Sequence, residues 1–273
     1  MKIAISNIIW PKGEENFEEF LKTSQELGFD AVELALNCIW EEPIQTNKVK
    51  FDQLKELLLK YGLEISALHS VTYTRPDLEF FATNQKKEEL IDYIKRYIDI
   101  SLYLGCKNIV YGSPTSRRKN NKPTQVCEEI FLDSLSQVDL YCNRSVIFNI
   151  EPLNSKICEF INSMREAKEL LVKRKFNSIG IQLDIRNCIE NGETPEDYLY
   201  VKEYVHHCQV GNPGLTIPGD VYLSEHLSFS SVLRQSDYNG FVAGEILSED
   251  KDSYRNNLKK AFSSLNQIYG SSN

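Results

Sequence analysis

The stretch FDQLKELLLKYGLEISALH, residues 51–69, contains a helix, a glycine and a strand in direct succession. In its first half, leucines and aromatic residues recur at steps of three and four, which places them on one face of a helix. Gly62 follows that helix, at the position where a left-handed residue commonly ends one. The β-rich run after it ends at the polar residue His69. The stretch therefore predicts one amphipathic helix packed beside one buried strand.

The same unit recurs along the whole chain, where β-rich runs alternate with segments of helical spacing. The predicted strands are Lys2–Ser6, Ala31–Leu34, Ile65–His69, Asn108–Tyr111, Val146–Ile150, Ile179–Leu183, Cys208–Val210 and Phe241–Ala243. Eight strand–helix units are the number in a closed (β/α)8 barrel, the TIM barrel. An open doubly wound sheet shows the same alternation, but usually has fewer strands and a G-x-G-x-x-G first turn, which this sequence lacks. We therefore predict an α/β fold with a single TIM barrel domain over residues 1–273.

The segments between the strands give two further predictions. One predicted helix covers residues 157–171, because apolar residues follow helical spacing there. The longest irregular stretches, residues 70–85, 112–122 and 210–228, each follow a predicted strand. In a barrel, such loops lie on the face that carries the active site.

Composition excludes several classes of function. The chain has 31 Lys and Arg against 39 Asp and Glu, a formal net charge of −8, which argues against nucleic acid as a partner. No apolar run is long enough to span a membrane, so no membrane partner is expected. Seven scattered cysteines without a C-x-x-C pair are typical of buried thiols in a reducing compartment. The chain opens on a predicted strand instead of a signal peptide, and we expect a cytoplasmic protein.

Polar residues stand where the predicted strands end: Glu33, His69, Glu151, Asp184, His207, Gln209 and Glu245. Glu151, Asp184, Gln209 and Glu245 are each about one strand–helix unit of roughly 30 residues apart, so they should converge at one end of a barrel. Converging carboxylates repel one another, and a divalent cation offsets that cost. Oxygen ligands favour Mn²⁺ or Mg²⁺. This hypothesis requires the acids to face a shared cation instead of arginine side chains.

Several of these residues also have a purely structural alternative. Asp184 could cap the helix that follows it, and Glu151 with its following proline could form a turn. Glu33 could belong to an internal ion pair, and His207 could be a hydrogen-bonded core histidine. His206, which points to the opposite side of the same strand, is predicted to be structural. The sequence leaves these alternatives open.

Seven stretches match, in order and spacing, those of one known family. They are KIAISNIIW (residues 2–10), GFDAVELAL (28–36), LGCKNIVYGSPTSR (104–117), NIEPLN (149–154), QLDIRN (182–187), HHCQVGNPGL (206–215) and YNGFVAGEIL (238–247). Through them the chain resembles the sugar phosphate isomerase/epimerase superfamily, whose xylose isomerase-like barrel is shared with endonuclease IV. The resemblance implies metal ligands at Glu151, Asp184, position 209 and Glu245, with the two glutamates also acting as the catalytic acid/base pair.

The chain departs from the family pattern at three positions. The seventh-strand metal ligand is normally the second histidine of an H-x-H, and here that segment reads His207-Cys208-Gln209. Asn187 stands where sugar epimerases often have histidine, and Asn212 stands where relatives have an acid. A glutamine carbonyl is a poorer zinc ligand than imidazole. Mn²⁺ or Mg²⁺ is therefore favoured over Zn²⁺, with no metal at all as the other possibility if the site is degenerate.

The resemblance implies a divalent-metal-dependent isomerase or epimerase of a sugar or sugar phosphate that works through an enediolate. Glu151 would remove a proton and Glu245 would return it. The expected substrate-binding residues are His69, Glu33, Ser113, Arg117, Asn187 and His207, with Arg117 in a loop that could meet a phosphate or carboxylate or could simply be solvated.

The same sequence is compatible with a second function. The alternative is a degenerate barrel that binds a sugar-like ligand without turnover, which the three departures favour. Whether the protein is an enzyme, which sugar it takes and whether it forms a homo-oligomer are left open. An endonuclease is set aside, because four histidines are too few for a trinuclear zinc site and the acidic charge balance argues against DNA.

Overall fold

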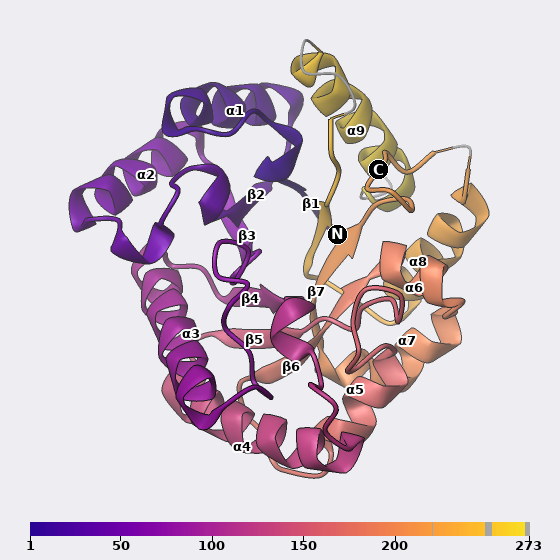
Figure 1. Cartoon of the computed structure of the whole chain (residues 1–273). Helices are drawn as coiled ribbons and strands as arrows, with labels where there is room; N and C mark the ends of the chain where they lie inside the picture. The colour runs from indigo at the N-terminus through magenta and orange to yellow at the C-terminus, as the bar shows by residue number, and fades with distance from the viewer. Residues whose placement is uncertain (220, 249–252, 271–273) are drawn as a thin grey trace.

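The computed structural model describes residues 1–219, 221–248 and 253–270. In it, parallel strands pair in sequence order and close into a barrel with helices around it (Figure 1). The strands are β1 (Lys2–Ser6), β2 (Ala31–Ala35), β3 (Glu64–His69), β4 (Asn108–Tyr111), β5 (Ile147–Ile150), β6 (Ile179–Asp184), β7 (Val205–Val210) and β8 (Phe241–Gly244). Pairing of β1 with β8 closes the barrel. The predicted α/β TIM barrel is therefore confirmed, with strand limits close to those read from the sequence.

Helices occupy the connections between the strands. They are α1 (Glu14–Leu27), α2 (Lys48–Tyr61), α3 (Asn84–Leu104), α4 (Thr124–Cys142), α5 (Met164–Leu171), α6 (Ile185–Asn191), α7 (Pro195–Val201), α8 (Leu223–Gln235) and α9 (Tyr254–Tyr269). Short 3-10 helices are η1 (Asn7–Ile9), η2 (Leu36–Cys38), η3 (Pro43–Gln45), η4 (Thr115–Arg117) and η5 (Lys202–Tyr204). Gly62 ends α2 with φ of 63°, as its position in the sequence predicts.

The helix predicted over residues 157–171 begins later than expected. Ser163 caps α5, its hydroxyl accepting a hydrogen bond from the Glu166 amide at 3.1 Å, so the helix starts at Met164. Ile161 has φ of 65°, a left-handed value that breaks a helix, and Ile157 is 56% exposed. Apolar spacing over residues 157–163 was therefore misleading, because a local cap overrides it.

The seven cysteines are all buried and carry free thiols, as predicted. Within the described ranges, no helix combines the length and the apolar character that crossing a membrane requires.

The interior of the barrel changes from small apolar side chains to polar ones along the strands. Ala4, Ala31 and Ala243, from three neighbouring strands, pack against one another. Because side chains alternate between the two faces of a strand, the residues two positions further on, Ser6 and Glu33 among them, face the same interior. Both are completely buried. The carboxyl-terminal half of the barrel is therefore filled by polar groups that must find partners within it.

A cluster of aromatic rings fixes two of the loops around the mouth of the barrel. Phe131 on α4 packs edge-on against Phe80 with ring centroids 4.9 Å apart and against Phe160 at 5.4 Å. Phe81 also packs edge-on against Phe160, at 5.1 Å. Phe80 and Phe81 belong to the loop after β3 and Phe160 to the loop after β5. These contacts join the two loops to one helix and hold them beside the strand ends.

Truncating the central ring of this cluster should be costly. We expect Phe131→Ala to lower the free energy of unfolding by about 3–5 kcal/mol, because it leaves a cavity among fully buried rings. Leu140→Ala on the same helix is the matched control, since Leu140 is 80% exposed and its loss should cost less than about 0.5 kcal/mol. Urea unfolding curves measure both, and equal losses would contradict the role of the cluster.

A buried histidine links the loop after β7 to the last two helices. His226 on α8 accepts a hydrogen bond from the Tyr269 hydroxyl at Nδ1, with 2.6 Å between the atoms, and donates from Nε2 to Asn212 Oδ1 at 2.9 Å. Asn212, one of the departures from the family pattern, thus accepts a buried hydrogen bond from His226. Burial lowers the pKa of His226 to about 4.

This histidine should make the protein sensitive to acid. Its pKa is lower in the folded state than in the unfolded state, so its stabilising effect is present above pH 6.5 and is lost as the pH falls towards 4. The loss should reach about 3 kcal/mol. In His226→Gln, unfolding free energies measured between pH 7 and pH 4 should fall less steeply than in the wild type. Parallel curves would show that His226 does not titrate in this way.

Candidate active site

Three acidic side chains meet around one arginine at the carboxyl ends of β5, β6 and β8. Glu151 follows β5, Asp184 ends β6 and Glu245 follows β8. Nη2 of Arg186 lies 2.9 Å from Asp184 Oδ2, 3.4 Å from Glu245 Oε2 and 3.9 Å from Glu151 Oε1. The structure therefore brings the three acids together as the spacing of the strands suggested. The positive group between them, however, is a side chain that the sequence analysis did not assign to the site.

The junction of β6 and α6 places Arg186 there. Asp184 is the N-cap of α6, and its Oδ1 accepts a hydrogen bond from the Arg186 amide at 2.9 Å. This cap starts the helix directly at the strand end, so Arg186 lies in the first turn and its guanidinium reaches Asp184 Oδ2. Asp184 therefore has both of the roles considered for it, the helix cap and a member of the site.

Asn187 joins two of the acids. Its side-chain amide donates to Glu151 Oε1 at 2.8 Å and to Asp184 Oδ2 at 2.5 Å. Like-charged carboxylates that lie close together repel, and a shared donor reduces the cost of holding them there. The asparagine found in place of the family's histidine thus acts as a donor to two carboxylates.

A second polar group lies deeper in the barrel. Glu33, completely buried, accepts a hydrogen bond from Gln209 Nε2 at 3.0 Å and has Oε2 3.8 Å from His69 Nε2. His69 Nε2 is also 2.8 Å from Ser6 Oγ. On its other side, His69 Nδ1 is 3.6 Å from Glu245 Oε1, so His69 connects the deeper group to the acids at the mouth. His207 lies with its Nε2 3.7 Å from Glu33 Oε1.

The two glutamates at the mouth differ in their electrostatics. Burial raises the pKa of Glu151 well above its usual value, and the charges of Asp184 and Glu245 raise it further. Burial also acts to raise the pKa of Glu245, but His69 and Arg186 outweigh it, and the net shift is downward. Burial lowers the pKa of Arg186, and the three carboxylates reverse that effect and raise it. Arg186 is therefore firmly charged, beside one carboxyl group that favours its proton and one that favours ionisation.

Burial also shifts the pKa values of the polar residues deeper in the barrel. It raises the pKa of Glu33 to about 7, while it lowers the pKa of His207 to about 3. Burial lowers the pKa of His69 as well, but the nearby Glu33 and Glu245 more than compensate and raise it overall. His69 is thus the histidine of this group that favours the charged form.

The residues present do not fit the divalent metal that the family resemblance implies. Gln209 Oε1 accepts a hydrogen bond from Gln182 Nε2 at 3.2 Å, and its amide nitrogen faces Glu33. The guanidinium of Arg186 contacts the other three expected ligands. Within residues 1–219, 221–248 and 253–270, no group of three or more His, Cys, Asp or Glu side chains is arranged to hold a metal ion. Of the residues expected to be metal ligands, Glu151, Asp184 and Glu245 thus surround an arginine, while Gln209 lies deeper and contacts Glu33 and Gln182.

Arg117 and Ser113 have contacts of a different kind from those expected of substrate-binding residues. Arg117 is completely buried and donates to the backbone carbonyls of Phe160, at 3.2 Å, and Gly112. These bonds join the loops after β4 and β5. Ser113 Oγ accepts a hydrogen bond from the Thr72 hydroxyl at 2.7 Å, which joins the loops after β3 and β4.

Gly112, at the neighbouring strand end, lies close against the Glu151 carboxylate. A Cβ atom at Gly112 would collide with Glu151 Oε2. The glycine thus leaves room for the carboxylate to lie across the end of β4.

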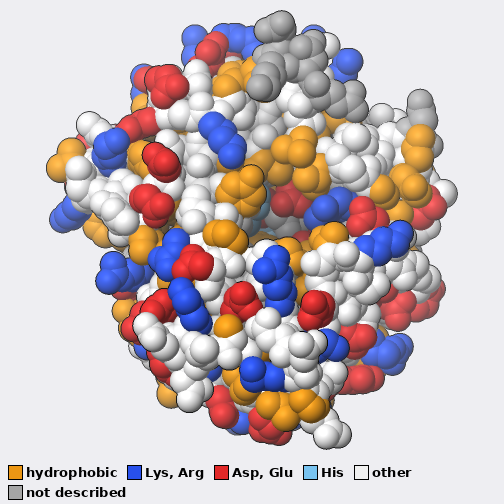
Figure 2. All heavy atoms as spheres, viewed as in Figure 1, with side chains coloured by type: hydrophobic (Ala, Val, Ile, Leu, Met, Phe, Trp, Pro, Cys, Tyr) orange, Lys and Arg blue, Asp and Glu red, His pale blue; other side chains and the backbone are white. Residues whose placement is uncertain are grey.

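The mouth of the barrel is hollowed. Figure 2 shows a depression near the centre of this face, with acidic and basic side chains at its edge. The side chains of Arg186 and Glu245 each keep 16% of their surface exposed, and that of Glu151 keeps 9%. The group is thus largely enclosed, with a small part of it open to solvent.

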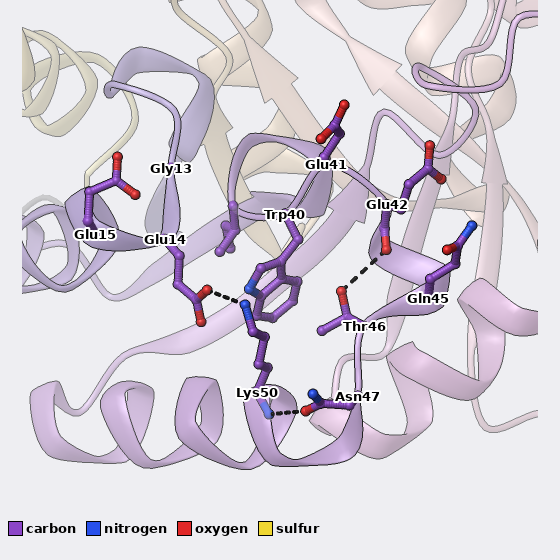
Figure 3. Close-up of a pocket in the computed structure, with 11 residues that line it drawn as sticks. Gly13, Glu14, Glu15, Trp40, Glu41, Glu42, Gln45, Thr46, Asn47 and Lys50 are labelled. Atoms are coloured by element: carbon purple, nitrogen blue, oxygen red, sulfur yellow. Dashed lines mark hydrogen bonds and ion pairs between the residues drawn. The ribbon is translucent and has the colours of Figure 1, made fainter.

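A separate cavity of about 500 Å³ lies among the loops after β1 and β2 (Figure 3). Glutamates line it, and Lys50 pairs with one of them, Glu14, at 2.6 Å. None of its lining residues belongs to the group around Arg186. It is an acidic feature of the rim and not part of the strand-end site.

The fold and the position of this site define a class, the single α/β barrels that carry polar groups at the carboxyl ends of their strands. The sequence profile of the xylose isomerase-like TIM barrel family matches residues 21–267. The chain belongs to this family, as the seven stretches indicated. No curated protein matches the sequence significantly.

Solved structures resemble the chain over almost its whole length. D-psicose 3-epimerase determined with D-fructose has a TM-score of 0.81 at 14% identity, covering 99% of this chain and 100% of the other. 3-Keto-D-glucoside 4-epimerase from E. coli has a TM-score of 0.77 at 20% identity, covering 96% and 99%. The IolI protein determined with a zinc atom has a TM-score of 0.75 at 15% identity, covering 98% of each chain. At such identities, the likeness establishes the fold.

Arg186 is the member of the site that sequence reasoning missed. It was visible in QLDIRN, two residues after the predicted ligand Asp184. A charged residue in the first turn after a strand is usually solvated, and only the direction of the side chain reveals its contacts with acids from β5 and β8.

Replacing the shared amide donor by a carboxylate should destabilise the group. We expect Asn187→Asp to lower the free energy of unfolding by about 3 kcal/mol, because it removes two hydrogen bonds and buries another negative charge. Asn191→Asp on α6 is the matched control, since Asn191 donates to the backbone carbonyl of Asn162 at 2.8 Å. Thermal unfolding compares the two, and similar shifts in Tm would show that Asn187 has no special role.

Proposed function

We propose that the protein is an isomerase or epimerase of a sugar or sugar phosphate, with Glu151 and Glu245 as its acid/base pair. The observation that carries the proposal is that these two carboxylates, at the ends of β5 and β8, both lie beside the partly exposed guanidinium of Arg186. Paired carboxyl groups around a hollow suit proton transfer to and from carbon. The family and the fold are compatible with this chemistry.

The fold likeness to sugar epimerases supports the choice of substrate class. Two of the similar structures are named as epimerases of keto sugars, one of D-psicose and one of a 3-keto-D-glucoside. In both names the substrate has a carbonyl group beside carbons that bear hydroxyls. A fold alone does not establish function, so the substrate remains part of the proposal.

The reaction needs one group to take a proton and one to give it. One glutamate removes the proton from the carbon next to the carbonyl, and the electron pair of the broken C–H bond moves to give an enediolate. The other carboxyl returns a proton to that carbon from the opposite face in an epimerisation. His69 and Asn187, which contact Glu245 and Glu151 respectively, would hold these carboxyl groups in place. Ser113, Glu33 and His207 contact other protein groups and are proposed as support for the site.

A second candidate is a binding protein without turnover. Arg186 contacts all three acids, and this favours a site in which the carboxylates are neutralised instead of poised for catalysis. Such a protein would bind a sugar-like ligand in the same hollow and leave it unchanged.

Proton exchange separates the two candidates. We expect a keto sugar or keto sugar phosphate to exchange its α-hydrogen with D2O, as measured by NMR, in the presence of the wild-type protein. Glu151→Gln and Glu245→Gln should each reduce that rate by about 10² or more. Glu41→Gln, at an exposed position on the rim cavity, is the control and should leave the rate unchanged.

A different result would favour the second candidate. If sugars raise the Tm of the protein but no sugar in the panel exchanges a proton, the protein binds without turnover and the enzymatic proposal fails.

A further inference from the structure

We propose that Arg186 takes the position of the divalent cation in this barrel, so that the site binds an anionic or carbonyl oxygen through a guanidinium and does not bind a metal. The part about metal rests on the contacts within the site alone. The part about the ligand rests on the proposed function and names the group that would hold the oxygen of its substrate.

The carboxylate oxygens of the three acids already accept hydrogen bonds from protein donors. Asp184 Oδ1 accepts from the Arg186 amide, and Asp184 Oδ2 accepts from both Arg186 Nη2 and Asn187 Nδ2. Glu151 Oε1 accepts from Asn187, and Glu245 Oε2 accepts from Arg186 at 3.4 Å. A cation at the centre of this group would compete with these donors for both oxygens of Asp184 and for one oxygen of each glutamate.

Gln209, the fourth expected metal ligand, is turned away from this role by its neighbours. Gln209 is held by two neighbours, since it donates to Glu33 and accepts from Gln182. Its amide nitrogen cannot ligate a cation, because it carries hydrogens and has no free electron pair. Turning the amide over would face its oxygen towards the buried carboxylate of Glu33. The neighbours of Gln209 therefore favour the orientation that does not bind metal.

Arg186 already supplies positive charge among the three acids. Three acids surround one guanidinium, which supplies a permanent positive charge where a divalent cation would supply two. Bringing a divalent cation close to Arg186 would add repulsion between like charges. The local charge is thus balanced in part by a group that the chain itself carries, and displacement of that group is the condition for binding a metal.

The guanidinium of Arg186 is suited to bind an oxygen atom of a ligand. It has N–H groups in a plane and binds oxyanions through directed hydrogen bonds. Because the Arg186 side chain keeps 16% of its surface exposed, a small molecule in solution can reach it. A donor held in a water-poor site stabilises negative charge that develops on an oxygen. The ligand class is therefore a small molecule with a carbonyl or carboxylate oxygen, the enediolate of the proposed reaction included.

The test is a titration of the protein with Mn²⁺. Electron paramagnetic resonance measures the free ion during the titration, and calorimetry measures the heat of binding. We expect the wild-type protein to bind no Mn²⁺ in one-to-one ratio at micromolar concentrations. Arg186→Met uncovers the three carboxylates and should bind Mn²⁺ at least about tenfold more tightly than the wild type. Arg186→Lys keeps the positive charge and should resemble the wild type.

The control separates a specific site from general attraction. Arg165→Met removes the same charge from an exposed position, where the side chain is 54% exposed and 3.6 Å from Asp197. It should leave Mn²⁺ binding at the wild-type level. Tight one-to-one binding by the wild type would overturn the inference, as would equal gains in Arg165→Met and Arg186→Met. Should Arg186→Met fail to fold, the wild-type and Arg186→Lys titrations still decide the question.

Failure of this inference can be told apart from failure of the proposed function. If the wild type exchanges sugar protons only after Mn²⁺ is added, the inference is wrong and the proposed function stands. If Mn²⁺ does not bind and no sugar exchanges protons, the inference stands and the proposed function fails. Exchange in the presence of EDTA supports both.

Discussion

The ion-pair group of Arg186 with the acids from β5, β6 and β8 is the interaction on which the mouth of the barrel depends. Three carboxylates that lie close together at strand ends would repel one another in a low-dielectric environment. The guanidinium and the Asn187 amide offset that repulsion with directed hydrogen bonds. Both donors come from the first turn of α6, and Asp184 caps that turn. A single strand–helix junction therefore supplies the group that allows acids from separate strands to lie together.

Below this group, the barrel interior is polar and continuous. Ser6, His69, Glu33 and Gln209 follow one another from β1, β3, β2 and β7 through contacts of 2.8, 3.8 and 3.0 Å. The apolar core of the protein lies mainly between the barrel and its helices, where the aromatic cluster on α4 also holds the loops after β3 and β5. The site thus rests on hydrogen-bonded strand residues inside the barrel, while outer packing fixes the loops above them.

The proposed acid/base pair, Glu151 and Glu245, lies around an organic cation, the guanidinium of Arg186. The family resemblance implies a site in which a metal ion holds the carboxylates and polarises the substrate carbonyl. Here the carboxylate oxygens bind an arginine and an asparagine, and the glutamine at position 209 binds its neighbours in the barrel. Arginine can stabilise an oxyanion but cannot act as a Lewis acid at a vacant coordination position. In the proposed site, the framework of the family therefore carries a different source of positive charge.

The sequence by itself determined the fold, because period-two strands, helical spacing and glycine caps are local patterns that each residue's neighbours dictate. It also determined which acids end the strands, since strand order fixes their place at one end of a barrel. It misplaced the start of α5, where Ser163 caps the helix at a later position than the apolar spacing indicates. Only the tertiary structure decided what lies between the acids. Local spacing cannot give the direction of a long arginine side chain, which follows from the charges of residues distant in sequence and from the cap at Asp184.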